Sequence, residues 1–409
     1  MTGVPEQVRS VSLDLALEGT SPHVALPGAA HPMASALAAT GTEPWLDTGD
    51  RGAAASAWDP EVKALTTNNT LVNQVIQSGA LDEVIAGASK RLRAAAPGID
   101  DGVLIREIGF IANARVALDL VRTFGVKVSV ELHPAIAEDV NATVAWGRRY
   151  SAVCPQDFIV KVPMTPAAFL AVRKLSAERV PVNFTLGFSA RQNVLAALFS
   201  RPLWVNVFLG RLNAVVHDNE VGSGANVGER ACLASDAAIK ALRREPGGPP
   251  TRQIAASIRD GAQVRALAGV DVHTAPPKAF VQYLNSDLDP TTVRPYESIL
   301  LPVDTDLDCA VLWSVSPEFE AFARAAGGQG ADVRTPGDLV ELARSHGIND
   351  LFREWTPDER AEIRADGKIP VLEKWLPGAT LDDLMTRAAL ESFTADQATL
   401  DDRIRGLAC

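Results

Sequence analysis

Lys161 is the residue with the clearest chemical potential in this sequence, because it interrupts a run of apolar residues. The run is Phe158-Ile159-Val160-Lys161-Val162-Pro163, and a short β-branched stretch closed by proline predicts a buried strand of a parallel sheet. Burial disfavours an ammonium ion and can lower the pKa of a lysine by up to roughly 3–5 units. A neutral amine can attack a carbonyl carbon and form a Schiff base. The alternative is that Lys161 only forms an ion pair with a buried carboxylate.

Two acidic residues could move protons beside this lysine. Glu131 ends the run Val128-Ser129-Val130-Glu131, and Asp47 lies near the end of another apolar run. A buried carboxylate next to a neutral lysine is a candidate general acid and base. For Glu131 the alternative is a plain ion pair with that lysine. For Asp47, and for Asn68 after the next run, the alternative is a helix N-cap.

Two arginines at neighbouring strand ends predict a phosphate site. Arg259 follows Ser257 at a predicted strand end and helix start, where backbone N–H groups and the helix dipole favour anions. Arg211 adds a second guanidinium, and Gly210 before it allows close approach of the backbone.

The elements that must position these side chains read as alternating strands and helices, which is typical of a parallel sheet built from βα units. Eight such units predict a (β/α)8 barrel, whose active site lies at the C-terminal ends of the strands. Further polar residues expected there are Asn183, Thr185 and Asn206. The predicted strands are Pro44–Thr48, Ala64–Asn68, Lys127–Leu132, Phe158–Pro163, Val180–Leu186, Leu203–Leu209, Arg252–Ser257 and Val270–Ala275.

We expect four segments along the chain. Residues 1–40 are predicted to be a loosely ordered N-terminal extension without a chemical role, and residues 41–285 the catalytic barrel. Residues 286–380 change pattern and predict an inserted, mainly helical subdomain or lid. Residues 381–409 carry helical apolar spacing and predict C-terminal helical structure packed on the barrel.

Composition limits the possible partners. With 39 basic and 50 acidic residues the net charge is −11, which argues against an extended nucleic-acid surface. Apolar runs are too short to span a membrane and no signal peptide is evident, so we expect a cytoplasmic protein. Neither the four cysteines nor the six histidines have metal-ligand spacing, so no metal site is predicted.

In its order of motifs the sequence resembles the transaldolase family, the Schiff-base aldolases of the pentose phosphate route. The lysine strand and Val182-Asn183-Phe184-Thr185 are the most specific matches, and Phe393-Thr394-Ala395-Asp396-Gln397 resembles the family's terminal motif. The resemblance implies phosphorylated sugar substrates, no metal or organic cofactor, and a monomer or homodimer.

The resemblance also implies a role for each candidate residue. Lys161 would form the Schiff base, Asp47 would handle the proton of the C4 hydroxyl, and Glu131 would shuttle protons through a water placed by Thr185. Asn68 and Asn183 would hold the hydroxyls of the three-carbon ketone, and Arg211, Ser257 and Arg259 would hold the phosphate. Asn206 and Phe208 are the other expected substrate-binding residues.

Departures from the family pattern bear on specificity. Asn206 stands where a serine usually contacts the donor fragment, which predicts an altered donor preference, and Asn69-Thr70 and Leu132-His133 also differ. Glu131 and Phe208 favour transfer of the fragment, because the aldolase branch has Gln and Tyr there. The alternatives are an aldolase that releases free dihydroxyacetone or uses another donor sugar, and a non-catalytic scaffold, which the presence of Lys161 disfavours.

Overall fold

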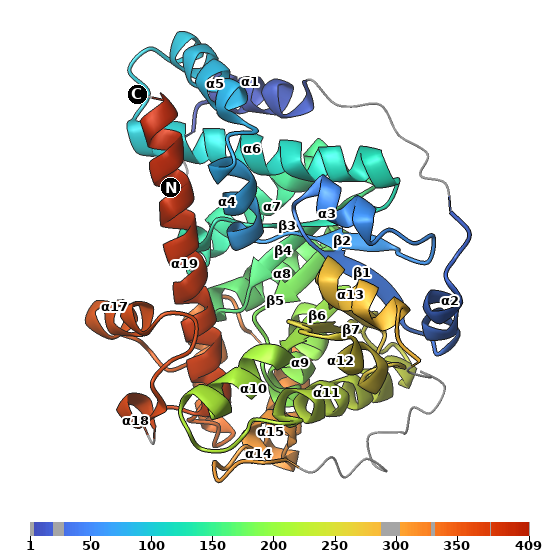
Figure 1. The fold of residues 1–409 in the computed structure, drawn as a ribbon. Coiled ribbons are helices and arrows are strands. Elements are labelled where there is room, and N and C mark those ends of the chain that lie inside the picture. Colours follow the sequence, from blue (N-terminus) through green and yellow to red (C-terminus); the bar gives the residue numbers. More distant parts are fainter. Residues whose placement is uncertain (1–3, 19–27, 288–302, 329–331, 377, 409) are drawn as a thin grey trace.

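The computed structural model describes residues 4–18, 28–287, 303–328, 332–376 and 378–408. Eight parallel strands close into a barrel in chain order, from β1 to β8 (Figure 1). The predicted (β/α)8 barrel is thereby confirmed, and each predicted strand overlaps an observed one. The strands are β1 (Glu43–Asp47), β2 (Ala64–Thr66), β3 (Lys127–Glu131), β4 (Phe158–Pro163), β5 (Val182–Thr185), β6 (Trp204–Phe208), β7 (Arg252–Ala256) and β8 (Val272–Ala275).

The register of the strands aligns the polar side chains. Glu131 of β3 pairs with Lys161 of β4, and Lys161 pairs with Asn183 of β5. Paired residues of neighbouring parallel strands point to the same side of the sheet. These three side chains therefore face the barrel interior together, where charged groups need partners.

Helices cover the outside of the barrel. Their N-termini are often capped by the residue that ends the preceding loop: Thr165 accepts from the N–H of Ala168 at 3.0 Å, and Pro166 opens the helix after the lysine strand. The helices within the barrel are α3 (Arg51–Ser56), α4 (Asn69–Gln77), α5 (Asp82–Ala95), α6 (Asp101–Phe124), η1 (Pro134–Ile136), α7 (Val140–Val153), α8 (Pro166–Ala177), α9 (Ala190–Leu195), the π-helical η2 (Ala196–Ser200), α10 (Leu209–Asp218), α11 (Val227–Arg244), α12 (Gly261–Ala266) and α13 (Pro277–Leu284).

The described part of the N-terminal segment is packed, which differs from the loose extension expected from its composition. It contains α1 (Glu6–Leu17) and α2 (Pro32–Ala39). Helix α1 packs against α5 and α6, and Val8, Leu15 and Ala16 are buried. The helical pattern in the sequence is weak, so it did not predict this packing. A few buried apolar contacts are nevertheless enough to dock a helix.

The segment after α13 forms short helices on the outside of the barrel. They are α14 (Ala310–Trp313), α15 (Pro317–Gly327), α16 (Pro336–Ser345), α17 (Pro357–Asp366) and α18 (Leu372–Trp375). Helix α15 packs against α9 and η2, and α16 packs against α8. Residues 288–302, near the start of this segment, lie outside the described residues.

The chain continues into one long helix, α19 (Leu381–Ala408), in the segment for which C-terminal helical structure was predicted. Figure 1 shows it in red along one side of the barrel, beside α4 and α6. It contacts α4, α5, α6 and α17. In the part of the chain that the structure describes, no helix has the length and apolar character needed to cross a membrane.

Candidate active site

A polar cavity opens where the strands end, and it brings most of the predicted residues together. Its water-accessible volume is about 170 Å³, which leaves room for a small polar ligand. The predicted residues that line it are Asp47, Asn68, Lys161, Asn183, Asn206, Phe208, Arg211, Ser257 and Arg259. Glu131 and Thr185 lie behind this lining, where they contact Lys161 and Asn206 respectively.

Lys161 is 4% exposed and lies between a carbonyl and a carboxylate. Its Nζ donates to the carbonyl of Thr67 at 3.2 Å and lies 3.2 Å from Oε2 of Glu131. The ion-pair contact weighed as an alternative is thus present. Neither oxygen of Glu131 has a well-formed hydrogen bond to a described residue, so this buried carboxylate retains acceptor capacity for a water or a substrate hydroxyl.

Both carboxylates near Lys161 are shifted toward the protonated form. Burial raises the pKa of Glu131 and of Asp47, and the charge of Lys161 opposes the shift in each case. Asp47 also accepts from the hydroxyl of Thr66 at 2.6 Å, and Thr66 contacts Thr274 at 2.6 Å. Two buried carboxyls that can hold or release a proton therefore flank one amine.

A helix-capping role was the alternative for both Asp47 and Asn68, and it applies only to Asn68. Helix α3 is capped by Asp50, whose carboxylate accepts from the N–H of Ala53, so Asp47 is not its cap. Asn68 does cap α4, through the N–H of Leu71 at 2.9 Å. It lines the cavity as well, so its two possible roles coexist.

Asn206 is committed to its protein neighbours. Its amide nitrogen donates to Thr185 at 2.8 Å and to Asn183 at 3.2 Å, and its oxygen accepts from the N–H of Gly187 at 3.3 Å. Asn183 in turn donates to Ser129 at 3.2 Å. A serine at position 206 has a single donor hydrogen and could not make both donations, so the larger amide orients Asn183 and Thr185 together.

The first turn of α10 and the β7–α12 loop approach each other closely beside the arginines of the cavity. A Cβ on Gly210, in that first turn, would lie 2.2 Å from the carbonyl oxygen of Ser257 and 2.7 Å from Nε of Arg259. Glycine is therefore required for this close packing of α10 against the β7–α12 loop. Ser257 adopts φ 64°, a conformation that costs non-glycine residues about 1–3 kcal/mol and is concentrated at functional sites.

The arginines at this end lack carboxylate partners. Among described residues neither Arg211 nor Arg259 has a side-chain hydrogen bond or ion pair, and Nη1 of Arg211 is buried without one. Burial, followed by the charge of Arg259, lowers the pKa of Arg211 to about 10. Two guanidinium groups held near each other without a directly bonded carboxylate are suited to a ligand that carries negative charge.

Among the lining residues that were not predicted site residues, two come from beyond residue 311. The centre of the Phe393 ring, from α19, lies 5.9 Å from Nζ of Lys161 and 5.3 Å from Cζ of Arg211. Its motif was recognised in the sequence without a role at the site. Lys368, from the α17–α18 loop, also lines the cavity. No periodicity or motif marks it, because its position depends on the path of the whole preceding segment.

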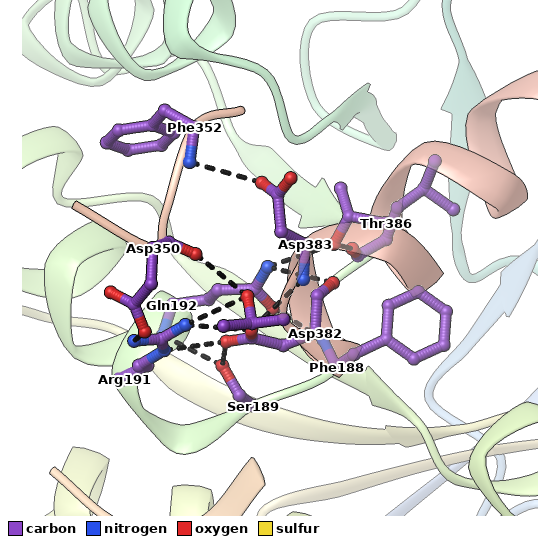
Figure 2. A network of polar contacts seen from close by, with 11 residues as sticks. Phe188, Ser189, Arg191, Gln192, Asp350, Phe352, Asp382, Asp383 and Thr386 are labelled. Carbon is purple, nitrogen blue, oxygen red and sulfur yellow. Dashed lines mark hydrogen bonds and ion pairs between the residues drawn. The ribbon is translucent and has the colours of Figure 1, made fainter. Parts of the chain in front are cut away.

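Helix α19 is held at the site from both sides. Figure 2 shows its first turn beside the loop that follows β5. Arg191 donates to both oxygens of Asp382, at 2.8 and 2.9 Å, and Thr386 donates to the carbonyl of Leu186 at 2.9 Å. Farther along α19, Asp396 accepts from the hydroxyl of Thr70. The helix is thus tied to the loop and the start of α9 that follow β5, and to the first turn of α4, which follows β2.

Comparison with known proteins identifies the relatives of this fold and site. Residues 44–311 match the model of the transaldolase/fructose-6-phosphate aldolase family. A probable transaldolase of Thermus thermophilus is 36% identical over 189 residues, which is 46% of this chain and 75% of the relative. One of Exiguobacterium sibiricum is 32% identical over 213 residues, or 52% of this chain and 84% of the relative. The chain therefore belongs to the transaldolase/fructose-6-phosphate aldolase family of enzymes, as its motifs predicted.

Proposed function

We propose that this protein is a transaldolase that moves a dihydroxyacetone unit from a ketose phosphate to an aldose phosphate through a Schiff base on Lys161, a reaction of the pentose phosphate route. One observation carries the proposal. The buried Nζ of Lys161 lies 3.2 Å from Oε2 of Glu131, in a cavity whose opposite end presents two arginines without carboxylate partners.

The first stage forms the imine. A proton passes from the Lys161 ammonium to the Glu131 carboxylate, which burial makes more basic, and the free amine attacks C2 of the ketose. Glu131 then returns a proton to the C2 hydroxyl of the carbinolamine. Water leaves and the C=N bond forms, with a water near Thr185 as the proton carrier.

The second stage breaks and remakes a carbon–carbon bond. Asp47 takes the proton of the C4 hydroxyl, the C3–C4 bond breaks, and its electron pair moves into the protonated imine to give an enamine. The aldose phosphate leaves, and C3 of the enamine attacks the aldehyde of the acceptor. Asp47 then gives its proton to the new alkoxide, and hydrolysis releases the product from Lys161.

Binding groups divide along the cavity according to their chemistry. In this proposal Asn68 and Asn183 hydrogen-bond the hydroxyls of the three-carbon fragment, and both line the cavity with Lys161. Arg211, Ser257 and Arg259 hold the phosphate, because charge-assisted hydrogen bonds to an anion are the strongest.

The second candidate function is an aldolase that releases free dihydroxyacetone. Phe208 and Phe393 argue against it, because the apolar rings that line the cavity offer a hydrolytic water no strong hydrogen-bonding group. The test is to supply fructose 6-phosphate and erythrose 4-phosphate at saturating concentrations and to measure the ratio of transferred product to free dihydroxyacetone. Mostly free ketone would select the aldolase.

The experiment that tests the Schiff base is borohydride trapping with fructose 6-phosphate, read by mass spectrometry. We expect a reduced adduct on Lys161 and none in Lys161→Met. The matched control is Lys127→Met, because Lys127 is an exposed lysine at the start of β3 whose Nζ donates to the carbonyl of Gln156. Trapping that persists in Lys161→Met, or a label on Lys127, contradicts the mechanism.

A further inference from the structure

We infer that Lys368 is an additional phosphate-binding residue of this site. It belongs to a segment outside the family match and is not one of the phosphate-binding residues proposed above. The inference rests on the proposed function for the identity of the sugar, and it adds a specificity-determining contact from the α17–α18 loop. The chemical class it recognises is a phosphate monoester.

Lys368 is placed at the rim of the cavity with its amine uncommitted. It lines the same cavity as Arg211 and Arg259, and it is exposed. Among the described residues Nζ of Lys368 has no hydrogen bond or ion pair. The nearby Lys374 differs, since it contacts Asp366 at 2.7 Å. Lys374 of α18 thus ties this helix to the end of α17, whereas Lys368 of the intervening loop faces the cavity.

The loop that carries Lys368 is fixed to the helix that carries Arg211. Asn219, directly after α10, donates to the carbonyl of Pro370 at 3.0 Å and accepts from the N–H of Leu372 at 2.8 Å. Gly367, at φ 90°, turns the chain out of α17 in a conformation that favours glycine. Lys368 is therefore a positioned side chain on an anchored loop.

The charges around the cavity favour a dianion over a neutral sugar. Its lining holds four cationic side chains, Lys161, Arg211, Arg259 and Lys368, and one carboxylate, Asp47, in a protein of net charge −11. A phosphate monoester carries about −1.5 to −2 charges and three acceptor oxygens. The guanidinium groups can bind it with directional contacts, while the lysine ammonium adds a point charge from the solvent side.

Phosphate binding and steady-state kinetics of the full chain test this assignment. In Lys368→Met we expect the Kd of inorganic phosphate, measured by calorimetry, and the KM of erythrose 4-phosphate to rise about three- to tenfold, because the contact is exposed. The loss should appear in KM, should shrink as salt is added, and should be absent with non-phosphorylated glyceraldehyde. Lys368→Arg should restore most of the affinity. Lys90→Met removes an exposed lysine of α5 and serves as the charge control.

Two results would overturn the assignment. One is a Kd for phosphate equal to that of the Lys90→Met control. The other is an equal rise in KM for glyceraldehyde, which would mean that the lysine supports the loop. Failure of the proposed function gives a different pattern, because a protein without transfer activity would still show the change in phosphate Kd if Lys368 binds phosphate.

Discussion

The inner and outer parts of the cavity come from different parts of the chain. Lys161, Glu131 and Asn183 stand on three adjacent strands, in register with one another. Phe393 and Lys368 come from a helix and a loop beyond residue 311, where the family match ends. The inner part is fixed by the hydrogen bonds of the barrel, whereas the outer part depends on side-chain contacts between separate elements.

This difference assigns different tasks to the two parts. Groups that move protons must hold their positions to within a fraction of an ångström, and strands of a closed barrel provide that rigidity. Groups that exclude water or attract a phosphate tolerate more variation. We therefore expect changes in the inner part to lower kcat, and changes in the outer part to alter KM or the partitioning of the intermediate.

The largest expected effect follows from Glu131→Gln in the inner part. The amide cannot exchange protons with the carbinolamine, so kcat for transfer should fall about 10²- to 10⁴-fold. KM for fructose 6-phosphate should change little, since Glu131 lies behind the cavity lining. Steady-state kinetics with a circular dichroism check of folding provide the measurement. A loss smaller than tenfold would remove Glu131 from the proton path.

In the outer part, Phe393→Ala should change the fate of the intermediate more than its formation. The ring is 3% exposed and covers Lys161 and Arg211. Removing it admits water, so the ratio of free dihydroxyacetone to transferred product should rise about tenfold, equivalent to about 1.4 kcal/mol of lost discrimination. Borohydride trapping on Lys161 should persist.

Phe393→Leu is the matched control, because it keeps an apolar side chain over the lysine. It should retain most of the partitioning toward transfer. An unchanged ratio in Phe393→Ala would show that α19 does not shield the intermediate from water, and the division of tasks between inner and outer parts would fail.

The smallest effect on catalysis is expected for a change at the attachment of α19, where the effect falls on stability instead. Burial raises the pKa of Asp383 to about 6, from an ordinary value of 3.8. The folded state therefore binds this proton more tightly than the unfolded state does, so the Asp383 contribution to stability falls as pH rises from about 4 to about 6. Asp383→Asn lacks this dependence and keeps an oxygen for the N–H of Phe352.

Denaturant unfolding of both proteins at pH 4 and pH 7 measures this effect. The free energy of unfolding of the variant minus that of the wild type should become more positive by about 2–3 kcal/mol between the two pH values. Transfer activity at neutral pH should stay close to that of the wild type. A difference that is independent of pH would contradict the assigned pKa.

The barrel and its inner residues were predictable because strong local signals produced them. Short, mostly apolar runs marked the strands, and alternation placed Lys161 and Glu131 on the inner face before any contact was known. Local signals were less accurate at the boundary between a strand and the helix that follows it. Leu209 was assigned to the end of a strand, whereas the chain turns into α10 at this residue, directly after Phe208.

The outer residues could not be predicted in the same way. Phe393 belongs to an amphipathic helix, and its pattern shows which face is apolar without showing which surface that face will cover. Lys368 lies in a short loop with no periodicity, and its place at the cavity depends on Asn219, about 150 residues earlier in the chain. Asn206 was located correctly, but its use of both amide hydrogens on neighbouring side chains required coordinates.

The position of Phe393 in the chain has a consequence for the order of events during synthesis. The ribosome completes the last barrel strand, at Ala275, roughly 120 residues before it reaches Phe393, a delay of roughly 6–24 s at ordinary rates of translation. Under the proposed mechanism, a barrel that closes during this interval would present the Lys161 amine to cellular aldehydes and ketones without the covering ring. We therefore expect the nascent chain to be most open to unproductive carbonyl adducts just before α19 docks.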